Sequence, residues 1–254
     1  MLRLHHIRRN HCTMAKHGKK YEAAVERVDR EREYPPEEAV ALLKEIAYAN
    51  FDETIEVHYR LGIDPRQADQ AVRSTVTLPH GTGSEVRVLV FAVGDAARAA
   101  EAAGADYVGS DDLVEQINGG WLEFDATIAM ADQMSKVGGL GRILGRRGLM
   151  PNPRAGTVVR DAEDLPEVIS GVKGGRIEYR NDRTGLIHNA IGKKSFESQQ
   201  ILENLLALTD AIQRSRPDSV RGQFCQSIYI TSTMSPGIKL DVAATLAAAE
   251  ELVS

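Results

Sequence analysis

The chain has 254 residues, of which 43% are hydrophobic and 26% charged, and its formal net charge is −5. This composition is typical of a soluble globular protein of one large or two ordinary domains, and no apolar run approaches the roughly 18 residues that span a bilayer. The two cysteines, Cys12 and Cys225, fit neither a zinc motif nor a disulfide framework. We therefore expect a cytoplasmic protein with no membrane partner.

Positive charge is concentrated in two segments of this acidic chain. Residues 1–20 contain six Lys and Arg and no acid, and residues 141–154 contain four Arg and again no acid. Such uneven charge suggests a polyanionic partner at selected faces; the alternative for the first segment is a solvated basic run. Because residues 1–13 lack the apolar stretch of a secretory signal, we expect a disordered extension or a start codon assigned too early.

The first predicted elements are one helix and two strands. An initial proline, early acids and apolar residues at helical spacing predict a helix over 35–47. Strict alternation of apolar and polar residues predicts a half-buried strand over 53–63, and a shorter strand follows at 74–79.

The pattern changes after the glycine-rich segment 80–83. Residues 86–94 form an almost continuous apolar run, which is typical of a strand buried on both faces. Short strands and helices then alternate, which favours a parallel sheet with helical crossovers. The expected strands are 106–109 and 124–131, and the expected helices are 95–105, 111–120, a glycine-broken 132–145 and 161–175.

The alternating pattern returns near the end of the chain. Residues 175–182 and 185–192 predict two strands joined by an Asn-Asp turn, that is, a hairpin. Residues 195–217 predict a long helix with Ser195 at its N-cap, and residues 223–234 predict a strand. An Ala-rich helix is expected at the C-terminus.

We therefore predict an α/β protein made of two domains. An α+β outer domain with an antiparallel sheet is formed by both chain ends, residues 14–81 and 173–240. A Rossmann-like three-layer α/β domain, residues 82–172, is inserted into it, and residues 241–254 form a helical tail. The glycines at both crossings predict a hinge.

No catalytic or metal-binding constellation stands out from the sequence. Gly139, Gly141 and Gly145 have the wrong spacing for a dinucleotide loop, and Lys193 lacks the glycine of a phosphate-binding Walker loop. We therefore expect neither enzyme activity, nor a small-molecule substrate, cofactor or metal. The alternative is a nucleotide-binding enzyme that uses the inserted domain.

Residues 141–156, GRILGRRGLMPNPRAG, form the most distinctive segment. Two prolines restrict the backbone of its second half to extended conformations, and guanidinium groups bind phosphate oxygens in pairs. We predict that the segment binds a polyanion; the alternative is that its arginines pair with acids of their own domain. The candidate contacts with such a polyanion are Arg142, Arg146, Arg147 and Arg154.

This segment closely resembles the signature of the ribosomal protein L1 (uL1) family, bacterial proteins of the large-subunit stalk. Residues 61–83, 103–109, 175–188 and 229–234 resemble the family in the same order, and the likeness covers residues 14 to about 238. The resemblance implies a two-domain protein without catalytic activity that binds large-subunit ribosomal RNA. It also implies release of transfer RNA from the exit site and repression of the messenger RNA of its own operon.

The resemblance places the ribosomal RNA face on the outer domain. A flat surface of hydroxyls and apolar atoms fits the minor groove of RNA. Three positions depart from the family pattern and change the expected affinity: Asn50 replaces a common Lys, Arg146 a Pro, and Ser235 a Gly. The implied contacts are Phe51, Thr54, Ser232, Thr233 and Met234, with phosphate contacts from Lys173, Arg176 and Arg180.

Overall fold

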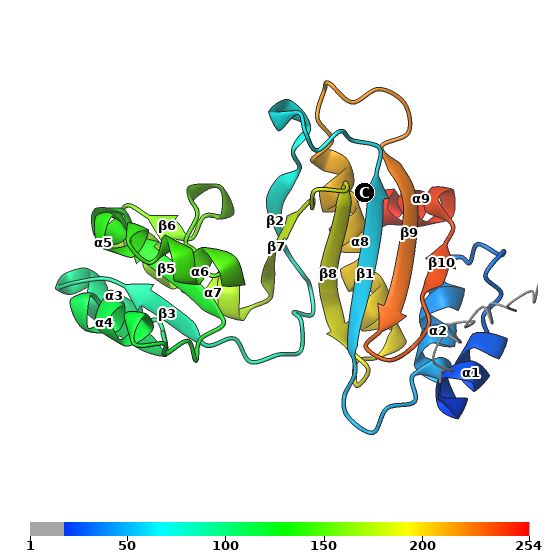
Figure 1. Cartoon of the computed structure of the whole chain (residues 1–254), viewed down its shortest axis with the longest axis horizontal. Helices are drawn as coiled ribbons and strands as arrows, with labels where there is room; N and C mark the ends of the chain where they lie inside the picture. Colours follow the sequence, from blue (N-terminus) through cyan, green and yellow to red (C-terminus); the bar gives the residue numbers. More distant parts are fainter. Residues whose placement is uncertain (1–17, 254) are drawn as a thin grey trace, which may run out of the picture.

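The computed structural model describes residues 18–253 and contains, within them, three β-sheets flanked by helices (Figure 1). The predicted α/β class is confirmed, whereas the exact domain boundaries stay a prediction. Residues 1–13, expected to be an extension, lie outside the described residues. No helix between residues 18 and 253 is both long and apolar enough to cross a membrane.

A four-stranded antiparallel sheet brings together distant parts of the chain. Its order is β10-β9-β1-β8, so the central strand β1 (Thr54–Leu61) lies between β8 (Leu186–Lys193) and β9 (Cys225–Ser232). The short edge strand β10 (Ile238–Leu240) was not predicted, because three residues carry too little periodicity.

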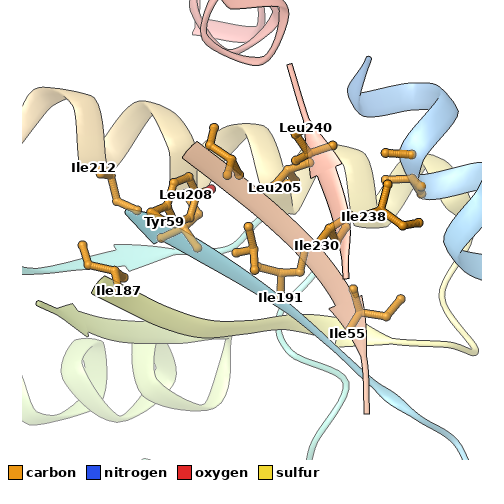
Figure 2. Close-up of a cluster of buried hydrophobic side chains, with 14 of the residues drawn as sticks. Ile55, Tyr59, Ile187, Ile191, Leu205, Leu208, Ile212, Ile230, Ile238 and Leu240 are labelled. Atoms are coloured by element: carbon orange, nitrogen blue, oxygen red, sulfur yellow. The ribbon is translucent and has the colours of Figure 1, made fainter. Parts of the chain in front are cut away.

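Helices cover one face of this sheet. The helices are α2 (Pro36–Ile46), α8 (Ser198–Arg214) and α9 (Val242–Val253), and α1 (Lys19–Glu26) lies beside α2 (Figure 1). Figure 2 shows the core between the sheet and α8, where Tyr59 lies near Leu208. The alternation predicted for β1 is confirmed, because Ile55, Val57, Tyr59 and Leu61 are all buried.

The start of α8 differs from the sequence prediction, whereas the C-terminal helix agrees with it. Helix α8 does not begin at Ser195: Glu197 is its N-cap and forms a capping box with Gln200, whose side chain accepts the Glu197 amide at 3.0 Å. The Ala-rich helix expected at the C-terminus is present as α9, which packs against α8 and buries Thr245 and Ala249.

A four-stranded parallel sheet with the order β4-β3-β5-β6 forms the other layered unit. Every residue of β3 (Val88–Phe91) is buried, as predicted, because helices cover both faces. Its remaining strands are β4 (Tyr107–Gly109), β5 (Ala126–Met130) and β6 (Val158–Val159). Helices α3 (Asp95–Ala102) and α7 (Leu165–Lys173) pack on one face, and α4 (Asp111–Asn118), α5 (Met134–Gly138) and α6 (Gly141–Arg147) on the other.

The hairpin predicted over residues 175–192 is wrong. Strand β7 (Arg176–Arg180) pairs with β2 (Arg73–Thr77) in a separate two-stranded ribbon, whereas β8 pairs with β1. The predicted turn does exist, since the Asp182 carboxylate accepts the Leu186 amide at 2.8 Å. The Leu61 amide donates to the Gly185 carbonyl at 2.9 Å, which places the turn at the end of β1 and directs β8 into the antiparallel sheet.

Candidate nucleic-acid interface

Four of the residues implicated in RNA binding meet at one end of the antiparallel sheet. The loop before β1 carries Phe51, the first residue of β1 is Thr54, and the loop after β9 carries Thr233 and Met234 (Figure 1, lower end of the sheet). Phe51 is 54% exposed and Met234 is 46% exposed, which is unusual for large apolar side chains. We call these four residues the paired-loop face.

Direct hydrogen bonds join the two segments of this face. The Thr54 amide donates to Thr233 Oγ1 at 3.1 Å, and the Thr233 amide donates to the Thr54 carbonyl at 3.1 Å. The Tyr48 hydroxyl donates to the Met234 carbonyl at 3.0 Å. The two loops therefore form one surface, although almost 180 residues of chain separate them.

A buried carboxylate that the sequence analysis missed lies under this face. Glu53 is fully buried, and its Oε1 accepts the Ala49 amide at 2.6 Å. Its Oε2 accepts the Met234 amide at 3.3 Å and the Ser232 hydroxyl. No cation pairs with Glu53 among residues 18–253, so its carboxyl group is held by backbone and hydroxyl donors alone.

Ser232 does not take the direct contact expected of it. Its side chain is 2% exposed and donates its hydroxyl to Glu53, so it supports the face from below. Ser235, which departs from the family pattern, closes the turn: its Oγ accepts the Ser232 amide at 3.0 Å. The serine side chain thus supplies a hydrogen bond that a glycine could not make.

Lysines that were not predicted surround the paired-loop face. Lys193 Nζ donates to Thr54 Oγ1 at 2.7 Å, and Lys194 Nζ donates to the Ala47 carbonyl at 2.6 Å. Lys44 Nζ donates to the Phe196 carbonyl at 2.6 Å. The Lys-Lys pair at 193–194 is the sequence signal that would have identified this rim.

The sheet continues from the paired-loop face as a surface without helices. His58 and His188 face each other across β1 and β8, with their Nδ1 atoms 2.8 Å apart. Burial, and next the charge of His188, lower the pKa of His58, while Glu56 acts in the opposite direction. A small groove along this surface also includes Tyr229 and Thr231.

The three cationic residues that the resemblance implicates in phosphate binding lie away from the paired-loop face. Lys173 pairs with Asp106 at 3.0 Å. The guanidinium group of Arg176 donates to Thr75 Oγ1 at 3.2 Å and is partly buried. Arg180 is exposed and, unlike the exposed Lys173, lacks an ion-pair partner among the described residues. The structure therefore does not bring these three to the paired-loop face.

The arginine-rich segment is part helix and part loop. Arg142, Arg146 and Arg147 lie on α6, and Arg154 lies in a short 3-10 turn, Pro153–Ala155, that follows the extended residue Asn152. All four side chains are exposed. None pairs with an acid in the described part of the chain, so the alternative of internal pairing is not supported there.

A cavity of about 1020 Å³ lies between this segment and the turn after β7. Its lining includes Arg73, Arg180 and Arg183, together with Gly148 and Asn152. Arg73 pairs with Glu178 across the ribbon, while Arg180 and Arg183 are exposed and unpaired among residues 18–253. The cavity is therefore a polar groove with two available guanidinium groups.

The parallel sheet offers little to a nucleotide. Nucleotides bind at the carboxyl ends of such strands, with phosphates at helix N-termini. Here Asp95 occupies the first turn of α3, and Asp111 and Asp112 occupy that of α4, where their charges repel phosphate. No group of three or more His, Cys, Asp or Glu that could hold a metal ion occurs in the part of the chain the structure describes.

Comparison with known proteins identifies close relatives over nearly the whole chain. A model of the Ribosomal protein L1p/L10e family matches residues 43–236. The large ribosomal subunit protein uL1 of Thermomicrobium roseum is 68% identical over 241 residues, which cover 95% of this chain and 100% of that protein. The uL1 proteins of Chloroflexus aggregans and Thermobifida fusca are 57% and 54% identical; the matches cover 91% and 92% of this chain and 98% and 99% of the relatives.

Proposed function

This chain belongs to the Ribosomal protein L1p/L10e family, and from that membership we propose that its paired-loop face binds large-subunit ribosomal RNA. Membership makes the protein a structural, non-enzymatic component of the large ribosomal subunit, located with the ribosome in the bacterial cytoplasm.

The observation that carries the proposal is the meeting of two distant segments in one exposed surface of hydroxyl and apolar groups. Thr233 Oγ1 accepts the Thr54 amide and lies 3.3 Å from the Thr54 carbonyl, which leaves one lone pair for an outside donor. The 2′-hydroxyl of RNA is such a donor. Phe51 and Met234 then supply apolar surface on which a base or ribose packs.

Lysines at the rim supply the electrostatic part of the interaction. Lys193 and Lys44 lie beside Thr54 and the loop after β8, where their ammonium groups now donate to neutral oxygens. Phosphate is a stronger acceptor than a hydroxyl or carbonyl oxygen. We propose that these lysines turn to RNA phosphates on binding, so affinity falls with salt.

We propose the groove at the opposite end of β1 as the contact for exit-site transfer RNA. Strand β1 has eight residues, so the two ends are roughly 25 Å apart at about 3.3 Å per residue. Arg180 and Arg183 line the groove, and the arginines of α6 extend the positive charge. One protein can then hold two RNA segments at once.

Repression of the protein's own messenger follows from the same surface. A messenger RNA that folds like the ribosomal RNA site would present the same 2′-hydroxyls to the paired-loop face. We propose that such a messenger competes with ribosomal RNA, so repression begins when ribosomal sites are filled.

One competition experiment tests the proposal. The full chain is titrated with a stalk fragment of ribosomal RNA, with transfer RNA and with ATP or NAD, each across a range of salt. We expect tight, salt-dependent binding of the stalk fragment, weaker binding of transfer RNA and none of the nucleotides. Measurable affinity for ATP or NAD without preference for structured RNA would instead favour the nucleotide-binding enzyme.

A further inference from the structure

The carboxylate of Glu53 connects both segments of the paired-loop face from below. Its three donors come from the chain on either side: Ala49 lies four residues before it, and Ser232 and Met234 lie 179 and 181 residues after it. A single side chain thus accepts hydrogen bonds from both the loop before β1 and the segment at the end of β9.

A fully buried glutamate such as Glu53 is uncommon in a purely structural role. A buried carboxylate costs free energy unless it is fully hydrogen-bonded, and no cation offsets it among the described residues. Backbone amides of both loops point inward to reach it, at 2.6 Å and 3.3 Å. The loops are therefore held in place before any ligand arrives.

We infer that Glu53 is the positioning residue of the RNA-binding face, an inference that rests on the proposed function. Loops that are already ordered lose less conformational entropy on binding, so a fixed pair of loops binds RNA more tightly than a mobile pair. Glu53 itself is fully buried and touches no RNA. Glu53 affects the affinity for RNA by fixing the positions of Thr233 and Met234.

The isosteric change Glu53→Gln separates positioning from packing. An amide has only one acceptor oxygen, whereas both carboxylate oxygens accept backbone amides here. Whichever way the amide turns, one loop amide faces an NH2 group and loses its acceptor. We expect that loop to become mobile and the affinity for the stalk RNA fragment to fall about tenfold.

The experiment compares Glu53→Gln with wild type and with Glu115→Gln, an exposed glutamate of α4 that carries the same charge change far from the face. Affinity is measured for the stalk RNA and for its 2′-deoxy counterpart, at a temperature where circular dichroism shows each protein folded. A positioning role predicts a loss of affinity and of the preference for RNA over DNA. A merely structural role lowers the melting temperature and leaves that preference unchanged.

A milder variant covers the case in which Glu53→Gln does not fold. Ser232→Ala removes one donor to Glu53, and this hydroxyl is too buried to touch RNA. Weaker RNA binding by folded Ser232→Ala supports the inference. Wild-type affinity and RNA preference in whichever of the two variants folds would overturn it. Failure of the wild type to bind stalk RNA would reject the proposed function, and this inference with it.

Discussion

Thr54 and Thr233 are joined by a reciprocal pair of hydrogen bonds that continues the antiparallel sheet past the end of β9. Each backbone amide donates to the other residue, one to a hydroxyl and one to a carbonyl, both at 3.1 Å. These two hydrogen bonds fix the position of Thr233 relative to β1. The hydroxyl proposed to contact RNA is therefore held in place by β1.

The substitution Thr233→Val tests that contact. Valine keeps the shape of threonine but removes the acceptor for the 2′-hydroxyl, so RNA affinity in a filter assay is expected to fall about five- to tenfold. The matched control is Thr77→Val, an exposed threonine on β2, which should bind as wild type does. Equal binding by Thr233→Val and the control would count against the paired-loop face.

Removing the charges of the arginine-rich segment tests the second contact. We expect Ala at Arg146, Arg147 and Arg154 to weaken transfer RNA binding and to make its salt dependence shallower by about one unit of slope per lost phosphate contact. Arg98→Ala on α3, a residue paired with Asp95, is the control. If affinity for both transfer RNA and ribosomal RNA is unchanged, the segment has a packing role only.

The two glycine-rich crossings between the sheet units meet at Gly81 and Gly175. A Cβ on Gly175 would lie 2.3 Å from the Cα of Gly81, and Gly175 has a φ of +101°. We expect Gly175→Ala to lower the free energy of unfolding by roughly 2–4 kcal/mol, measured by urea titration. Gly138→Ala on α5, where a Cβ meets nothing within 4 Å, should be neutral or stabilising by up to about 1 kcal/mol.

His58 makes the stability depend on pH. Its pKa in the folded protein lies below the ordinary value of 6.5, because burial and His188 disfavour the charged form. At a pH between this lowered pKa and 6.5, the unfolded chain therefore binds more protons than the folded protein. The free energy of unfolding consequently falls as the pH drops through and below 6.5. The variant His58→Gln should show a weaker dependence of the free energy of unfolding on pH in this range, measured by urea titration. The same pH dependence in variant and wild type would refute the assignment.

Local patterns predicted the elements well but not how they pair. The alternation in β1 depends only on which side chains face α8, so it is visible in the sequence. The partner of β7 is not visible in this way. An Asn-Asp turn specifies a change of direction, whereas the pairing of β8 with β1 depends on contacts with residues far earlier in the chain. Pairing over long distances leaves no short-range signal.

The exposed residues of the candidate site were predicted from the sequence, but the buried residues that support them were not. Phe51 and Met234 came from resemblance to a family, because their patterns alone would place them in a core. Glu53 was not predicted, because an acid in a polar segment is ordinarily exposed and two of its three donors lie more than 175 residues away. Ser232, expected at the surface, is part of the same support.

Hydrogen exchange of the full chain, with and without the stalk RNA fragment, tests the central claim most directly. The claim is that two segments from distant parts of the chain form one RNA-binding surface. It predicts that amides of residues 48–54 and of residues 231–236 both exchange more slowly when the fragment is bound. Protection confined to the parallel sheet unit, or to one of the two segments alone, would contradict it.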